Sequence, residues 1–323
     1  MKKKLFGVFV SIFVVAMLAL PMSVVSAKKP VVNDGDGYTE YVGTLGGANY
    51  VVRIPNEGWN GMLVVGCHGY MANNWYPDAQ FAMDNLAGVG LPFALVEQGF
   101  AYAASSYGEG GFSVKMGMIR THQLTQYVIG KFGVTGKVFI VGFSMGGLIG
   151  LLLGEKYPEL YDGVLDISGM RDIVLGYTDS VNGIAEIEAI PEFVWYNVLT
   201  QEERDYLSQL LLTLKQMKAD MEAEFGGIYD EKPKHYEKLN PVDNAEISIP
   251  MISVTGDQDE LSVNQVHTFE NAVIEAGCEQ YYKLYIVMSN PPPAPPAGHA
   301  TPPTIVAALS HLQELVNYPE PPW

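Results

Sequence analysis

Cysteine is scarce in this chain of 323 residues, which contains only Cys67 and Cys278. The sequence has no C-x-x-C pair, no H-E-x-x-H motif and no Walker-type glycine loop, so a bound metal or nucleotide has no support. We therefore expect neither a metal site nor a cofactor. One disulfide is possible outside the cell. The fold predicted below keeps the two cysteines apart, and we expect both to be packed thiols.

Positive charge is also scarce, because 19 Lys and Arg residues face 36 Asp and Glu residues, for a net charge of -17. Three of those lysines lie in the first four residues, so the chain without its N-terminal segment carries -17 - 3 = -20. Such a surface repels phosphate backbones and anionic headgroups. The charge therefore argues against nucleic-acid binding and electrostatic membrane docking, and it favours neutral or cationic substrates.

The N-terminus has the pattern of a secretory signal peptide. Three lysines precede an apolar run over 5–22, and Val25, Ser26 and Ala27 offer small residues for cleavage after Ala27. An uncleaved membrane anchor is the alternative, because the run approaches spanning length. Pro21 and the absence of a stop-transfer flank favour cleavage, and so predict a secreted or extracytoplasmic protein without stable membrane insertion. The sequence does not predict an oligomeric state.

The rest of the chain alternates between apolar runs and helical spacing, which indicates an α/β fold. We expect strands over 50–54, 62–66, 100–104, 137–141, 164–167, 250–254 and 282–287, and helices over 114–132 and 148–157. Continuous apolar runs of this length are typical of buried parallel strands. The pattern predicts a mostly parallel sheet with helices on both faces.

The interval 170–249 breaks the alternation. Thr200 and Glu203 form a capping box before a helix whose leucines and methionines recur at helical spacing. We interpret 170–249 as a helical cap or lid inserted into a core made of 28–169 and 250–323, after the signal peptide at 1–27. The alternative is a plain additional surface helix, but insertions in such sheets often cover the site.

The candidate nucleophile is Ser144, within Gly142-Phe143-Ser144-Met145-Gly146-Gly147. This G-x-S-x-G pattern follows a predicted buried strand and opens a predicted helix, where a sharp turn would raise the serine above the sheet. The glycines are needed because the turn brings backbones close together.

A serine hydroxyl needs a base to remove its proton. His299 follows the last strand on a loop, just before a helix that Thr301 caps and Pro302 begins. Three other histidines fall within predicted helices: His122, His267 and His311. His235 lies beside lysines in the insertion, and His68 is interpreted as structural. His299 is therefore the predicted base.

The orienting acid should follow the strand 250–254, in the segment Thr255-Gly256-Asp257-Gln258-Asp259. A tight turn after Gly256 favours Asp259, with Asp257 as the second candidate. The carboxylate would fix the imidazole tautomer and stabilise the imidazolium.

Two backbone N–H groups are expected to stabilise the oxyanion. One is that of Met145, directly after the nucleophile, and the other is that of Tyr70, in the loop after the strand 62–66. Gly69 would let this loop approach the substrate oxygen.

With these motifs the chain resembles the α/β-hydrolase superfamily. The matching segments are His68-Gly69-Tyr70, Gly142 to Gly146, Gly256 to Asp259 and Gly298-His299, and the resemblance spans about residues 60 to 317. It implies an eight-stranded, mostly parallel sheet and a Ser144, Asp259 and His299 triad. The proline-rich approach to His299 departs from the family pattern.

A secreted member with a cap is most similar to a carboxylesterase or lipase, so a small-molecule ester is the expected substrate. Apolar residues of the insertion would line an acyl or aromatic pocket, although they could equally pack the cap itself: Phe193, Trp195, Tyr196 and Leu210. A serine peptidase of the same fold and a non-catalytic binding module are the alternatives.

Overall fold

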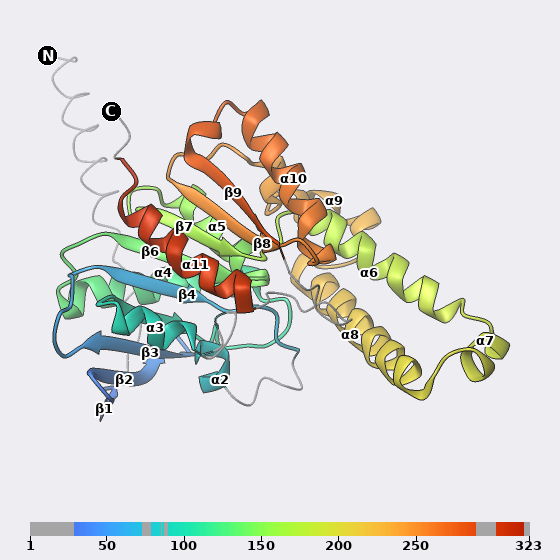
Figure 1. Ribbon diagram of the computed structural model, residues 1–323, viewed down its shortest axis with the longest axis horizontal. Helices are drawn as coiled ribbons and strands as arrows, with labels where there is room; N and C mark the ends of the chain where they lie inside the picture. The colour runs from blue at the N-terminus through green and yellow to red at the C-terminus, as the bar shows by residue number, and fades with distance from the viewer. Residues whose placement is uncertain (1–28, 73–78, 85, 87–89, 289–301, 320–323) are drawn as a thin grey trace, which may run out of the picture.

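A computed structural model describes residues 29–72, 79–84, 86, 90–288 and 302–319 of the chain. Its centre is one nine-stranded sheet (Figure 1). The strands are β1 Val31–Asp34, β2 Tyr38–Leu45, β3 Ala48–Pro55, β4 Leu63–Cys67, β5 Ala101–Ser105, β6 Val138–Phe143, β7 Gly163–Ile167, β8 Met251–Gly256 and β9 Tyr282–Val287.

The strand order is β1-β2-β3-β5-β4-β6-β7-β8-β9. The first four strands in this order pair antiparallel, and every pair from β5 to β9 is parallel. The expected α/β architecture with a mostly parallel sheet is thus confirmed. The sheet has nine strands rather than eight, because the exposed edge strand β1 adds to the hairpin of β2 and β3.

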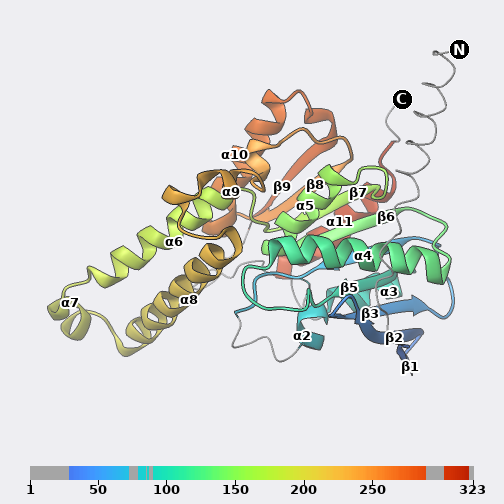
Figure 2. The ribbon, with the colours of Figure 1, turned by 180° about the vertical axis from the view of Figure 1, so that it is seen from behind.

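Helices cover both faces of the sheet, as Figures 1 and 2 show from opposite sides. One face packs on α4 Val114–Phe132, α5 Met145–Lys156 and α10 Glu260–Glu275. The other packs on α3 Leu91–Glu97 and α11 Pro302–Val316, with the short α2 Ala79–Asp84 nearby. The central strands β4 and β7 are wholly buried, as their continuous apolar sequences predict.

The insertion leaves the sheet after β7 and returns at β8. It contains α6 Ile173–Glu188, α7 Glu192–Asn197, α8 Gln201–Phe225 and α9 Pro233–Glu237. The helices α6 and α8 form a hairpin whose base lies beside the sheet and whose distal end, α7, projects away from it (Figures 1 and 2). The predicted capping box is present, with the Thr200 hydroxyl accepting from the Glu203 N–H at 3.2 Å.

Both cysteines are free, Cys67 being buried at the end of β4 and Cys278 partly exposed after α10. Burial raises the pKa of the Cys67 thiol to about 12, so it stays protonated at neutral pH. In the part of the chain that the structure describes, no helix combines the length and apolar character needed to cross a membrane.

Candidate active site

Ser144 occupies the sharp turn between β6 and α5. Its φ of 55° and ψ of -121° lie in a region that side-chain-bearing residues rarely adopt. The turn is held on both sides: the Ser144 N–H donates to Ile167 O at 3.1 Å, and Ser144 O accepts from the N–H groups of Gly147 and Met170. The strain is therefore built into the position of the candidate nucleophile, whose side chain is half-buried.

The glycines of the motif are required by close backbone approaches. A Cβ on Gly142 would lie 2.2 Å from Gly146 O, and a Cβ on Gly146 would lie 1.9 Å from Cys67 O. A Cβ on Gly147 would lie 2.1 Å from Asp166 Oδ1. Real Cβ atoms do not come this close to other atoms, so each position needs a glycine for the turn to form.

The loop after β4 lies against this turn. A Cβ on Gly69 would lie 3.2 Å from the Ser144 Cβ, so the segment from His68 to Tyr70 borders the nucleophile directly. Met145 begins α5, and its N–H belongs to the first turn of that helix, which has no intrahelical acceptor. The loop that contains Tyr70 and the first turn of α5 thus both adjoin Ser144.

His68 shapes this loop from inside the protein. Its ring is buried and stacks on Tyr107, with centroids 3.9 Å apart, and the Tyr107 hydroxyl donates to His68 O at 3.1 Å. The Nδ1 lies 2.8 Å from Gly69 O, so the neutral ring must carry its proton on Nδ1. Burial lowers the pKa of His68 to about 4, so the ring is neutral at neutral pH.

Tyr70 connects the loop to the insertion. Its hydroxyl donates to Asp220 Oδ2 at 2.7 Å, and Asp220 lies in the buried C-terminal part of α8. Gln216 also donates to Asp220, at 2.9 Å. Burial, with Asp220 as its acceptor, raises the Tyr70 pKa well above its usual range. The base of the α6–α8 hairpin is therefore hydrogen-bonded to the loop that borders Ser144.

Asp259 lies at the end of the turn that follows β8, two strands along the sheet from β6. Its side chain is buried and does not cap α10, whereas Asp257 is partly exposed and accepts a hydrogen bond from Gln258. The strand β7 lies between β6 and β8. The residue after it, Ser168, has a φ of 47°, and its N–H donates to Val254 O of β8. Asp259 and Asp257 thus differ in burial, and the choice between them as the orienting acid stays a prediction.

His299 lies outside the described residues, as do Thr301 and the proline run. The described segments on either side of it, β9 and α11, both lie at the turn from Gly256 to Asp259. Val287, at the end of β9, accepts from the Asp257 N–H at 3.0 Å. At the start of α11, Thr304 Oγ1 lies 3.3 Å from where a Cβ on Gly256 would be.

A buried ion pair beneath the nucleophile turn was missed by the sequence reasoning. Asp166 of β7 pairs with Arg171, both side chains being almost wholly buried, and accepts from Ser253 at 3.1 Å. Burial raises the pKa of the Asp166 carboxyl, against the opposing effect of Arg171. An aspartate inside an apolar strand run was the available signal. Because Asp166 fills the space that glycine leaves at Gly147, this pair supports the turn.

The four predicted pocket residues lie on the hairpin. Phe193, Trp195 and Tyr196 belong to α7 at its distal end, where 70% of Phe193 and 66% of Tyr196 is exposed. Leu210 is half-buried in the middle of α8. The structure does not bring these residues beside Ser144. Their expected role in substrate binding stays a prediction.

Three further observations bear on the class of protein. Residues 118–220 match the family model Esterase, whose description is "Putative esterase". No curated protein matches the sequence. Among the described residues, no group of three or more His, Cys, Asp or Glu side chains is arranged to hold a metal ion.

Solved structures of similar fold include esterases and peptidases. EstE5, in a crystal soaked with p-nitrophenyl butyrate, is 13% identical with a TM-score of 0.54, over 88% of this chain and 86% of that one. An esterase/lipase from an uncultured bacterium is 13% identical with a TM-score of 0.54, over 88% and 87%. A prolyl endopeptidase is 16% identical with a TM-score of 0.54, over 92% of this chain but only 39% of that one.

The fold and the strained serine turn define the class: the chain is an α/β-hydrolase-fold protein. The esterase family match covers only residues 118–220, from α4 to α8, and the neighbouring structures share the fold.

Proposed function

We propose that this protein hydrolyses carboxylic esters of small molecules through an acyl-enzyme on Ser144. The observation that carries the proposal is the backbone of Ser144, strained at the start of α5 and fixed by glycines that no other residue could replace. Strain of this kind is retained where it serves chemistry. The esterase family match over 118–220 supports the ester rather than the amide as substrate.

In the proposed reaction His299 removes the proton of the Ser144 hydroxyl as its oxygen attacks the ester carbonyl. Asp259 holds the imidazole tautomer and stabilises the imidazolium. The N–H groups of Met145 and Tyr70 donate to the oxyanion, each contributing about 3 to 4 kcal/mol to transition-state stabilisation. His299 then protonates the leaving alcohol and activates the water that releases the acid.

Chain connectivity supports His299 as the base. His299 is three residues before Pro302 in the sequence, and Pro302 begins α11. Thr304, in the first turn of that helix, contacts the Gly256 turn that ends in Asp259. A short loop from this point can bring an imidazole to both Asp259 and the neighbouring strand ends.

The proposal includes a cap role for the insertion and a signal-peptide role for the N-terminus. The hydrogen bond from Tyr70 to Asp220 supports 170–249 as a cap, because it couples the base of the hairpin to the oxyanion loop. Cleavage after Ala27 would release the protein to an extracytoplasmic compartment.

The test is hydrolysis of short p-nitrophenyl esters by the purified protein, its Ser144→Ala variant and a Ser208→Ala control. Ser208 is exposed on α8, so its loss should leave the rate unchanged. We expect Ser144→Ala to lose at least a thousandfold in kcat, as other serine hydrolases do. Unchanged activity in Ser144→Ala would refute the nucleophile. Paired ester and amide substrates with one acyl group would separate an esterase from a peptidase of this fold.

A further inference from the structure

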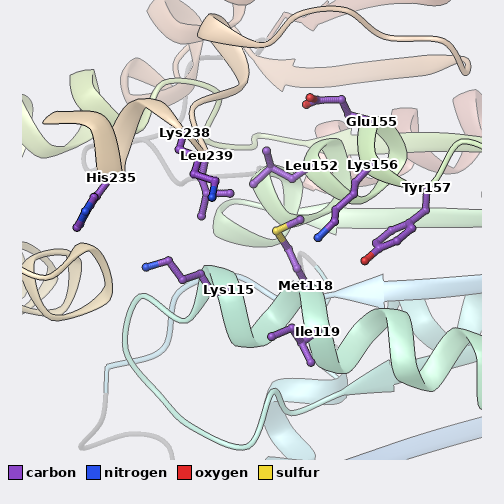
Figure 3. Close-up of a pocket in the computed structure, with 10 residues that line it drawn as sticks. All are labelled: Lys115, Met118, Ile119, Leu152, Glu155, Lys156, Tyr157, His235, Lys238 and Leu239. Atoms are coloured by element: carbon purple, nitrogen blue, oxygen red, sulfur yellow. The ribbon is translucent and has the colours of Figure 1, made fainter. Parts of the chain in front are cut away.

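A cavity lies on the flank of the sheet, between α4, the C-terminal half of α5 and α9 (Figure 3). Its volume is about 650 Å³, within the range of small-molecule sites. The α5 residues that line it begin at Leu152, eight residues beyond Ser144, which is about 12 Å along the helix. Ser144 does not line this cavity, so it is distinct from the proposed active site.

The floor of the cavity is apolar. Met118 and Leu152 are buried there, and Leu239 packs against the same core. Ile119 also lines the cavity, and 47% of it is exposed. An apolar chain or ring seated here would cover surface that is otherwise in contact with water.

The rim of the cavity is basic, against the sign of the whole chain. Lys115, Lys156 and Lys238 all line it, together with His235. Lys115 is held by Glu224, because its ammonium donates to the Glu224 backbone carbonyl and the Glu224 carboxylate accepts from the Lys115 backbone N–H. Across the described part of the chain, neither Lys156 nor Lys238 takes part in an ion pair.

One acid lines the cavity. Glu155 also borders the neighbouring cavity, where Glu246 and Glu275 lie, and Figure 3 shows its carboxyl apart from the Lys156 ammonium. The Lys156 ammonium and the Tyr157 hydroxyl instead extend toward the side of Met118 and Ile119 (Figure 3). Lys156 and Lys238, neither of which has an ion-pair partner among the described residues, therefore line a cavity with an apolar floor in a protein of strongly negative charge.

We propose that this cavity binds a carboxylate that carries an apolar chain, with Lys156 and Lys238 holding the carboxylate and the Met118, Leu152 and Leu239 floor holding the chain. A neutral amphiphile would leave the ammonium groups without a partner, and a small inorganic anion would leave the floor wet. The combination selects a ligand with both parts. Binding at this cavity does not depend on the reaction at Ser144.

The test is calorimetric titration of the purified protein with decanoate, and with decanamide as the uncharged analogue. We expect saturable decanoate binding that weakens at least tenfold in Lys156→Gln/Lys238→Gln and at least threefold in Lys238→Gln. Lys234→Gln is the matched control, since Lys234 lies on α9, whose C-cap is Lys238, but does not line the cavity. That variant should bind decanoate as the parent does.

Binding of decanamide as tightly as decanoate would overturn the proposal, because the cavity would then be only an apolar groove. Equal weakening in Lys234→Gln would overturn it by showing a general charge effect. Absence of decanoate binding to the folded parent would also overturn it. Repeating the titration with Ser144→Ala, which should bind decanoate unchanged, keeps this test separate from the fate of the proposed esterase activity.

Discussion

The Cα of Gly146 faces the carbonyl of Cys67 so closely that a Cβ on Gly146 would lie 1.9 Å from the Cys67 oxygen. This contact joins the first turn of α5 to the end of β4, and so fixes Ser144 against the loop that contains Tyr70. The position of the candidate nucleophile thus depends on an absent side chain.

Gly146→Ala should therefore damage both folding and activity. We expect the free energy of unfolding to fall by about 3 kcal/mol, the upper part of the range for overpacking, and ester hydrolysis to be lost. Denaturant titration measures the first effect. Gly130→Ala is the control, because this exposed glycine of α4 has open space around it and should gain about 0.5 to 1 kcal/mol. Equal stability of Gly146→Ala and the parent would show that the contact is not constraining.

The buried pair of Asp166 and Arg171 should matter for stability more than any surface ion pair. Arg171→Met leaves the Asp166 carboxylate buried without its partner, which should cost about 3 to 5 kcal/mol. The double variant Asp166→Asn/Arg171→Met removes the stranded charge and should recover part of that loss. Thermal and denaturant unfolding of both single variants and the double variant would measure the coupling. Simple additivity of the two single substitutions would contradict it.

His68 should make the protein less stable as the pH falls. Its folded pKa of about 4 lies below the ordinary value of 6.5, so between these values the unfolded chain binds a proton that the native state does not. The contribution of His68 to the free energy of unfolding is complete above about pH 6.5. It decreases toward pH 4, by about 3 kcal/mol in all. His68→Phe, which keeps a ring against Tyr107, should show a shallower loss.

Glu155 should act in the opposite direction. Burial, and then the charge of Glu246, raise its pKa to about 7, so the native state binds a proton that the unfolded chain has lost. Its effect is absent below about pH 4.5 and destabilising as the pH rises through 7. Glu155→Gln should therefore be more stable than the parent at pH 8, by about 2 kcal/mol after allowance for partial exposure, and equal to it at pH 4.5. A constant difference across this range would contradict the shifted pKa.

Much of the sheet could be predicted from the sequence, because a continuous apolar run as short as that of β6 is typical of a buried parallel strand. The helix over 114–132 was predicted to its bounds, and the G-x-S-x-G turn to its place. The strands β1 and β2 were not placed individually, since β1 is exposed, β2 is mostly half-buried and neither is a continuous apolar run. The eight-stranded expectation came from the resemblance and missed β1.

The insertion shows what local patterns leave open. Its helix and capping box followed from Thr200, Glu203 and the spacing of leucines. The direction of the hairpin depends on tertiary contacts at its base, such as Tyr70 with Asp220, which no local pattern contains. The same holds for Arg171, whose partner Asp166 lies in the preceding strand.

The most direct test of the account is to quench the protein during turnover of p-nitrophenyl butyrate and locate the acyl group by peptide mass spectrometry. The account predicts a burst of p-nitrophenol and a butyryl group on the peptide that contains Ser144, with neither in Ser144→Ala. An acyl group on another residue, or turnover that persists in Ser144→Ala, would contradict it.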